Sequence, residues 1–290
     1  MRLSTPPRVP PGYVVHRVGD TWLVLDRAWS SELVGLRLAD STVRQSLFAR
    51  SPRRGRGAAP IVSVGSDLSI LLRRYRHGGL FGGLTGPLLL GPQRALAELD
   101  VTARAETAGA PVPHVLCLVL WPVAGPLWSA VIGTREESRA RDLLAVWREQ
   151  PTARERWTLL RGVGEAVRRL HDAGVQHRDL QVRNVLLCPE PSERIVVIDL
   201  DRARFHASAP VSARVRASNL ARIVRSAVKE GLLDPRTGCR RELAALVGGY
   251  VGRDRTLRGA LRRRAAWERV KLFIHRIGYR LRGGVGSAAE

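Results

Sequence analysis

The feature that most constrains this chain is an ordered set of polar side chains in its second half, Asp179, Asn184 and Asp199. A predicted helix ends at Gly174, and glycine is the residue favoured just beyond a helix C-terminus. Asn184 follows Asp179 by five positions and precedes an apolar Val-Leu-Leu run. A short β-rich segment over 195–200 places Asp199 near its end. We therefore expect a helix, a polar loop and two buried strands to meet around these side chains.

The loop has the spacing His-Arg-Asp, four residues, Asn, which is typical of protein-kinase catalytic loops. In such a loop the acid reaches the acceptor hydroxyl, while the amide reaches a metal ion on the phosphates. Asp199 occupies the place of the metal-binding acid, with Asp-Leu-Asp where protein kinases have Asp-Phe-Gly. We predict that Asp179, Asn184 and Asp199 are catalytic, that Asn184 and Asp199 bind Mg²⁺, and that ATP is the donor. The alternative, a loop with accidental charges, leaves the order of two acids and an amide unexplained.

The first half of the chain should then bind the nucleotide. Arg73, on a predicted strand over 71–75, is the candidate for the cation that contacts the α- and β-phosphates, because Arg can bind phosphate in a bidentate manner. Glu98, on the next predicted helix, is the candidate to pair with it. Gly55 and Gly57 are candidates for a turn that covers the phosphates. The alternatives are a surface Arg, a solvated Glu and an ordinary Gly/Arg loop.

The order of predicted elements indicates an α+β fold with two lobes. The β-rich part has a hairpin, two strands, one helix and two more strands, over 13–26, 61–64, 68–75, 93–108 and 112–132. The helical part has helices over 136–150, 153–173 and 218–231, with the β segment 195–200 between the last two. We predict an N-lobe over 1–133 that binds the nucleotide and a C-lobe over 134–290 that carries the catalytic loop.

The charge balance points to an anionic partner. The chain of 290 residues has 48 Lys and Arg against 26 Asp and Glu, a formal charge of +22. Such a field attracts nucleic acid, an acidic membrane face or a phosphorylated substrate, and the ordered acids argue against nucleic acid. The three cysteines form no zinc or disulfide pattern, so a reducing, cytoplasmic setting is the simplest interpretation. Residues 1–11 do not resemble a signal peptide, and prolines interrupt the most apolar stretch, 112–132.

The C-terminal region is rich in Arg. Residues 253–282 interleave Arg with large apolar residues at steps of three and four, which predicts a basic amphipathic helix. It could dock on anionic lipid, with Arg74 and Arg76 assisting near the mouth of the cleft, or it could pack on the C-lobe. We leave both open.

With these residues in view, the chain resembles the lipopolysaccharide kinase family. The resemblance extends from about residue 55 to residue 229 and rests on several segments. They are Gly55-Arg56-Gly57, Leu72-Arg73-Arg74-Tyr75-Arg76-His77-Gly78-Gly79-Leu80, Arg94-Ala95-Leu96-Ala97-Glu98-Leu99, Gly109-Ala110-Pro111-Val112-Pro113, the catalytic loop, Ile198-Asp199-Leu200-Asp201-Arg202 and the Asn219-Leu220-Ala221-Arg222 helix. The branch that phosphorylates 3-deoxy-D-manno-octulosonic acid (Kdo) is the most similar.

The resemblance implies transfer of the γ-phosphate of ATP to the 4-hydroxyl of Kdo in a lipid A precursor, at the cytoplasmic face of a bacterial inner membrane. Two departures stand out: the family often has His-Ala-Asp-Leu-Asn and Asp-Phe-Asp, where this chain has His-Arg-Asp-Leu-Gln and Asp-Leu-Asp. Neither removes a catalytic group. Alternatives are a kinase of core heptose, of a small molecule or of a protein, and a catalytically inactive kinase fold that binds anionic partners.

Overall fold

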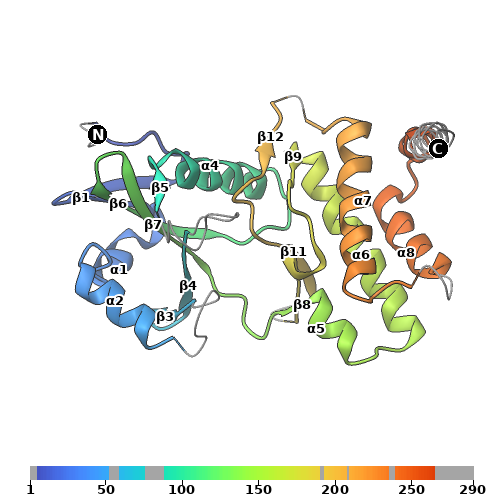
Figure 1. The fold of residues 1–290 in the computed structure, drawn as a ribbon, viewed down its shortest axis with the longest axis horizontal. Coiled ribbons are helices and arrows are strands. Elements are labelled where there is room, and N and C mark those ends of the chain that lie inside the picture. Colours follow the sequence, from blue (N-terminus) through green and yellow to red (C-terminus); the bar gives the residue numbers. More distant parts are fainter. Residues whose placement is uncertain are drawn as a thin grey trace, which may run out of the picture.

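The computed structural model describes residues 5–51, 59–75, 88–189, 193–207, 209–234 and 239–264. Two parts lie side by side in it, a sheet with flanking helices and a group of helices (Figure 1). The first part contains β1 (Tyr13–Val18), β2 (Thr21–Asp26), η1 (Arg27–Trp29), α1 (Ser30–Gly35), α2 (Ser41–Ala49), β3 (Ile61–Val64), β4 (Leu68–Arg74), β5 (Leu89–Leu90), α4 (Gln93–Thr107), β6 (Val115–Ala124) and β7 (Leu127–Arg135).

The second part is mostly helical. It contains β8 (Arg141–Asp142), α5 (Leu143–Arg148), α6 (Ala153–Asp172), β9 (Val175–Gln176), η3 (Val182–Asn184), β10 (Val185–Cys188), β11 (Arg194–Val197), β12 (Arg204–Phe205), α7 (Ala213–Lys229) and α8 (Arg240–Val251). The predicted α+β, two-lobed architecture is therefore correct. The proposed division at residue 133 falls inside β7 and stays a prediction.

The antiparallel sheet of the N-lobe has the order β1-β2-β6-β7-β4-β3, with β5 paired to β7. Hydrophobic residues pack on both of its faces. One cluster lies between the sheet and α4, and another lies between the sheet and α1 and α2. Because side chains alternate along a strand, neighbouring residues of β4 face these two different layers. This alternation sends Arg73 towards α4 and Arg74 towards α2.

The C-lobe core is built around α6. Its N-terminus has a capping box, in which Thr152 accepts from the Glu155 amide and the Glu155 carboxylate accepts from the Thr152 amide. The core also includes Val101 and Ala105 from the end of α4, so that helix packs against both lobes. Where α6 meets α8, the two backbones touch at glycines, and a Cβ on Gly164 would lie 2.1 Å from the Leu246 carbonyl oxygen.

Several predicted elements differ from the structure. The single helix expected over 136–150 is instead a bend, the short strand β8 and the short helix α5. Asp142 causes the break, since its carboxylate accepts a hydrogen bond from the Ala145 amide and so caps α5. Asp142 also pairs in register with Leu186 of β10, which joins the segment to the catalytic loop's own sheet.

Candidate active site

The catalytic loop is anchored by the imidazole of His177. Its Nδ1 accepts a hydrogen bond from the Asp179 amide at 3.1 Å, and its Nε2 donates to the Ile198 carbonyl oxygen at 3.0 Å. Burial lowers the pKa of His177, which favours the neutral ring that these two bonds require. The ring therefore ties Asp179 to the residue that precedes Asp199.

Asn184 adds a second connection between the same segments. Its side-chain amide donates to the Asp179 carbonyl oxygen at 2.9 Å, and its own carbonyl oxygen accepts from the Ile198 amide at 2.9 Å. The Asp179 carboxylate is partly buried, and its Oδ1 accepts a hydrogen bond from Nε2 of Gln181 at 2.6 Å. Asp179 and Asn184 thus belong to one hydrogen-bonded unit, and the bonds of His177 and Asn184 with Ile198 join it to the residue before Asp199.

Across the cleft, Arg73 of β4 pairs with Glu98 of α4 at 2.5 Å, as predicted. Glu98 is only 5% exposed, and its other oxygen accepts from the Tyr75 hydroxyl at 2.5 Å. Burial raises the pKa of Glu98, while Arg73 and Tyr75 oppose that shift by favouring the ionised carboxylate. The Arg73 side chain is still 38% exposed, so it is accessible to a ligand.

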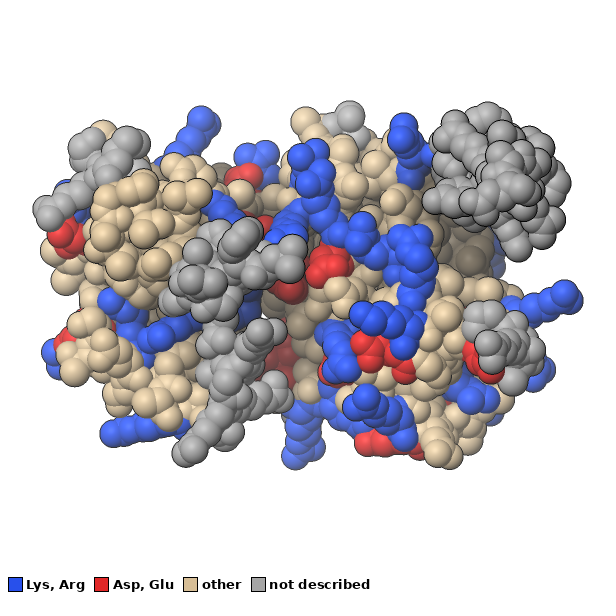
Figure 2. Space-filling model, in the orientation of Figure 1, with Lys and Arg blue, Asp and Glu red and all other residues tan. Residues whose placement is uncertain are grey.

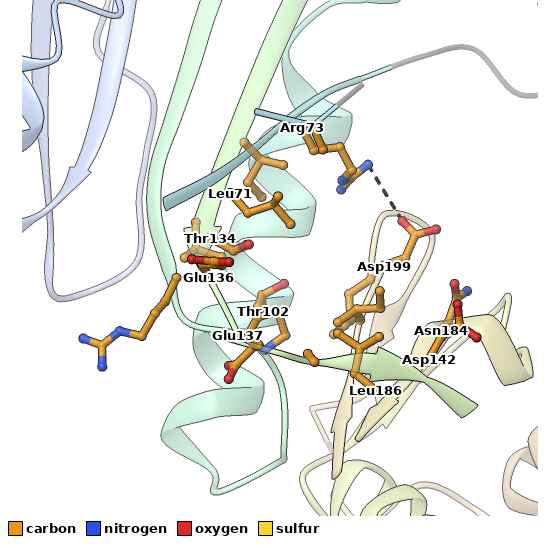
Figure 3. A pocket seen from close by; sticks show the side chains of 18 of the residues that line it. Leu71, Arg73, Thr102, Thr134, Glu136, Glu137, Asp142, Asn184, Leu186 and Asp199 are labelled. Atoms are coloured by element: carbon orange, nitrogen blue, oxygen red, sulfur yellow. Dashed lines mark ion pairs between the residues drawn. The ribbon is translucent and has the colours of Figure 1, made fainter. Parts of the chain in front are cut away.

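Arg73 also contacts the C-lobe acid. Its Nη1 lies 3.8 Å from Oδ1 of Asp199, and Figure 3 shows this ion pair as a dashed line. Asp199 has a φ of 63°, a left-handed conformation that is uncommon for a residue other than glycine. Outliers of this kind are held in place by the surrounding structure and gather at functional sites.

A cleft of about 710 Å³ lies where the lobes meet. Its polar lining includes Arg73, Glu98, Asn184 and Asp199. Its apolar lining includes Ile61, Leu71, Ile132, Leu186 and Leu200, from both lobes. Figure 3 shows Leu71 and Leu186 reaching into this region from the N-lobe and the C-lobe, with Asp199 and Asn184 adjacent. An apolar slot beside a cation, an amide and a carboxylate suits a flat ring joined to phosphates.

Two contacts around the cleft carry no signal in the sequence. Arg94 of α4 forms a bidentate ion pair with Asp201, two residues beyond Asp199. This pair joins α4 to the C-lobe, and bidentate Arg–carboxylate pairs fix orientation as well as distance. The Asp-Leu-Asp motif was visible in the sequence. Arg94 and Asp201, however, are 107 positions apart, and no local pattern indicates that they meet.

The second contact lies beneath the catalytic loop. Oδ1 of Asn219, on α7, accepts from the His177 amide and from Nε2 of His171, both at 3.0 Å. Nδ1 of His171 in turn accepts from the Tyr250 hydroxyl at 2.7 Å. Burial lowers the pKa of His171 to about 4, so the ring is neutral at physiological pH. The loop therefore rests on a buried network in which Asn219 and His171 are neutral, and the Tyr250 hydroxyl also accepts from the buried Arg216 at 3.1 Å.

Some predicted residues lie elsewhere or outside the described residues. Gly55, Gly57 and Arg76 are outside them, as is the predicted basic helix from residue 265 onward. Arg74 is described, and the expectation that it lies near the cleft mouth is wrong. Its guanidinium stacks over the Phe48 ring of α2 at 4.2 Å, on the sheet face opposite Arg73.

Similar proteins were found by sequence. A Kdo kinase of Vibrio cholerae is 30% identical over 180 residues, 61% of this chain and 72% of that protein. A Kdo kinase of Actinobacillus succinogenes is 32% identical over 164 residues, 55% of this chain and 65% of that protein. These similarities support the prediction that the chain is a kinase.

A similar solved structure is that of WaaP in complex with acyl carrier protein. It superposes with a TM-score of 0.53 and 24% identity, over 86% of this chain and 97% of that one. At this identity the likeness concerns the fold, and it confirms the kinase-like architecture.

The family model described as "Lipopolysaccharide kinase (Kdo/WaaP) family" matches residues 44–250. The match includes the Arg73–Glu98 pair, the catalytic loop and Asn219. The chain is a kinase, and it belongs to the lipopolysaccharide kinase (Kdo/WaaP) family.

Proposed function

We propose that this kinase transfers the γ-phosphoryl group of ATP to the 4-hydroxyl of Kdo in a lipid A or inner-core precursor. The observation that carries the proposal is the cleft in which Arg73, Asn184 and Asp199 meet, with Asp179 bonded to Asn184. The Kdo kinases among its relatives favour this acceptor over core heptose. The assignment of the hydroxyl rests on the family resemblance.

Each residue has a proposed role. Asp179 orients the acceptor hydroxyl and accepts its proton as the new O–P bond forms and ADP departs. Arg73, held by Glu98, contacts the α- and β-phosphates, and Gly55 and Gly57 cover them. The apolar slot formed by residues such as Leu71 and Leu186 takes the adenine ring.

The donor set fits Mg²⁺. The described residues contain no cluster of three or more His, Cys, Asp or Glu side chains that could hold a metal ion. Mg²⁺ bound to ATP, however, needs only one or two protein oxygens, because the phosphates and water supply the others. Asn184 and Asp199 would supply those oxygens, and the ion would neutralise charge on the phosphates. The long 3.8 Å contact to Arg73 leaves the Asp199 carboxylate available.

We also propose that the enzyme works attached to the cytoplasmic face of the inner membrane. No helix within the described ranges is long and apolar enough to cross a bilayer. Figure 2 shows Lys and Arg side chains gathered over the C-lobe near α7, beside acidic residues in the middle of this face. Each such cation close to an anionic surface contributes about 1 kcal/mol.

The acceptor is tested by mass analysis after incubation with ATP and either a Kdo-bearing lipid A precursor or a heptosylated core. One phosphate added to the first acceptor, with fragmentation placing it at the 4-position, is expected. If phosphate is found on heptose alone, the acceptor is core heptose and not Kdo.

Attachment is tested with vesicles. Binding to acidic vesicles, weak binding to neutral ones and release by high salt are expected, because the attraction is screened. Replacing Arg262, Arg263, Arg264 and Arg269 with Gln should weaken binding to the acidic vesicles. Salt-insensitive binding would contradict the electrostatic account.

A further inference from the structure

Gln181 is one of the two residues at which this catalytic loop departs from the pattern common in the family, the other being Arg178, and it touches the proposed catalytic acid. Its Nε2 donates to Oδ1 of Asp179 at 2.6 Å. A carboxylate can only accept, so the NH₂ end of the amide must face Asp179 and the Oε1 end must face away. None of the described residues provides a partner for Oε1.

The backbone of Gln181 is fixed on both sides. Its carbonyl oxygen accepts from the Asn184 amide at 3.0 Å, and the next amide, that of Val182, donates to the Ser226 hydroxyl at 3.2 Å. Ser226 belongs to α7, the helix that also anchors His177 through Asn219. The partly buried Gln181 side chain is therefore presented from a rigid base rather than from a free loop.

This contact leaves two acceptors on side chains that touch each other, Oδ2 of Asp179 and Oε1 of Gln181. Oδ2 of Asp179 is available for the attacking hydroxyl, since Gln181 occupies Oδ1, and Oε1 of Gln181 points away from that contact. A sugar that places its reacting hydroxyl at Asp179 has its nearest second donor on the adjoining carbon. An acceptor oxygen on a side chain that touches Asp179 would favour a sugar that has this second hydroxyl over one that lacks it.

We propose that Gln181 is a specificity residue: its nitrogen positions Asp179, and its oxygen accepts a hydrogen bond from the hydroxyl next to the one phosphorylated. The acceptor is thus a vicinal diol. The inference rests on the proposed function, because it takes Asp179 to be the group that receives the reacting hydroxyl.

The test uses two acceptors and three variants. The acceptors are the Kdo-bearing lipid A precursor and the same molecule deoxygenated at the 5-carbon, next to the 4-hydroxyl. The variants are Gln181→Met, which removes both ends of the amide, Gln181→Glu, which keeps only acceptor oxygens, and Gln45→Met as a matched control. Gln45 is exposed on α2, so the same change there alters no site residue.

The wild type and Gln45→Met should prefer the diol by about three- to tenfold in kcat/KM for the acceptor, the effect of one hydrogen bond. Gln181→Met should lose that preference. Gln181→Glu should keep it while its kcat falls, because a carboxylate offers acceptor oxygens but no N–H to position Asp179. The KM for ATP should stay within about twofold throughout.

An unaltered diol preference in Gln181→Met, with the wild type active, would overturn the inference and leave the proposed function standing. Equal use of both acceptors by the wild type would do the same. No phosphate transfer by the wild type to the Kdo acceptor would instead reject the acceptor itself, and the diol assignment with it. Thermal unfolding of each variant separates a folding defect from these outcomes.

Discussion

The two walls of the cleft are held by different kinds of interaction. On the N-lobe wall, Arg73 and Glu98 are joined by an ion pair, and Arg73 also reaches Asp199. Beneath the C-lobe wall, Asn219 and His171 are neutral groups joined by hydrogen bonds. The difference suits the tasks proposed for the walls: phosphates require charge, whereas a catalytic loop requires a fixed position. The predictions below separate these contributions, in order of decreasing size.

The largest effect is expected where the two walls meet. Asp179→Asn and Asp199→Asn should each lower phosphate transfer by about 100-fold or more, because one removes the base and the other a metal ligand. Circular dichroism should show an unchanged fold. Asp100→Asn is the control, since Asp100 forms an exposed pair with Arg104 on α4 and such pairs contribute little. Near-normal turnover in either variant would remove that residue from its role.

The next effect concerns the C-lobe support alone. Asn219→Ala leaves two buried donors without their acceptor, the His177 amide and Nε2 of His171. Since each such loss costs about 1–3 kcal/mol, the free energy of unfolding should fall by about 3 kcal/mol in urea titrations. Asn219→Asp keeps an acceptor oxygen and should therefore lower kcat less than Asn219→Ala does. Equal losses of kcat in the two variants would argue against the hydrogen-bond account.

A smaller effect is expected on the stability of the fold when the pH is lowered. Burial lowers the pKa of His171 to about 4, whereas the unfolded chain takes up this proton near pH 6.5. The unfolded state therefore binds more protons between these values, and stability falls as pH falls from about 6.5 towards 4. At pH 5 the loss from this group should be about 2 kcal/mol. His171→Gln should flatten the difference between pH 7 and pH 5, and an unchanged slope would contradict the assignment.

The smallest effect is expected from Arg73→Lys on the N-lobe wall. Lysine keeps the charge and stands at this position in protein kinases, but it lacks the planar fork that spans Glu98 and Asp199. The KM for ATP should rise about three- to tenfold, with kcat less affected. Measuring KM for ATP and for acceptor in the same preparations locates the effect. A rise in the acceptor KM alone would indicate that Arg73 contacts the acceptor rather than ATP.

The sequence predicted the parts of the fold that local signals specify. The hairpin β1–β2, the pair β3–β4 and helix α4 lie where alternation and helical periodicity placed them. The catalytic loop was recognisable because its spacing reflects chemistry within a few residues. Helices α1, α2 and α8 were missed, and α7 begins five residues earlier than expected, at Ala213 instead of residue 218.

The candidate site was predictable where one segment carries it, or where the order of neighbouring elements indicates a pair. The pairing of Arg73 with Glu98 was predicted from the order of strand and helix. The contacts of Arg94 with Asp201 and of Asn219 with His177 join segments that are far apart in the chain, so no periodicity reveals them. Arg74 was misplaced because adjacent strand residues face opposite sides of a sheet.

The left-handed backbone of Asp199 has a consequence for how such a protein changes under selection. A non-glycine residue in that conformation costs about 1–3 kcal/mol. Asp199→Gly should therefore yield an inactive protein that melts at a higher temperature than the equally inactive Asp199→Ala. A laboratory population screened for heat resistance alone would drift towards glycine here. Only a screen that scores turnover would retain the carboxylate. The residue found at position 199 would therefore show whether a population was selected for stability or for activity.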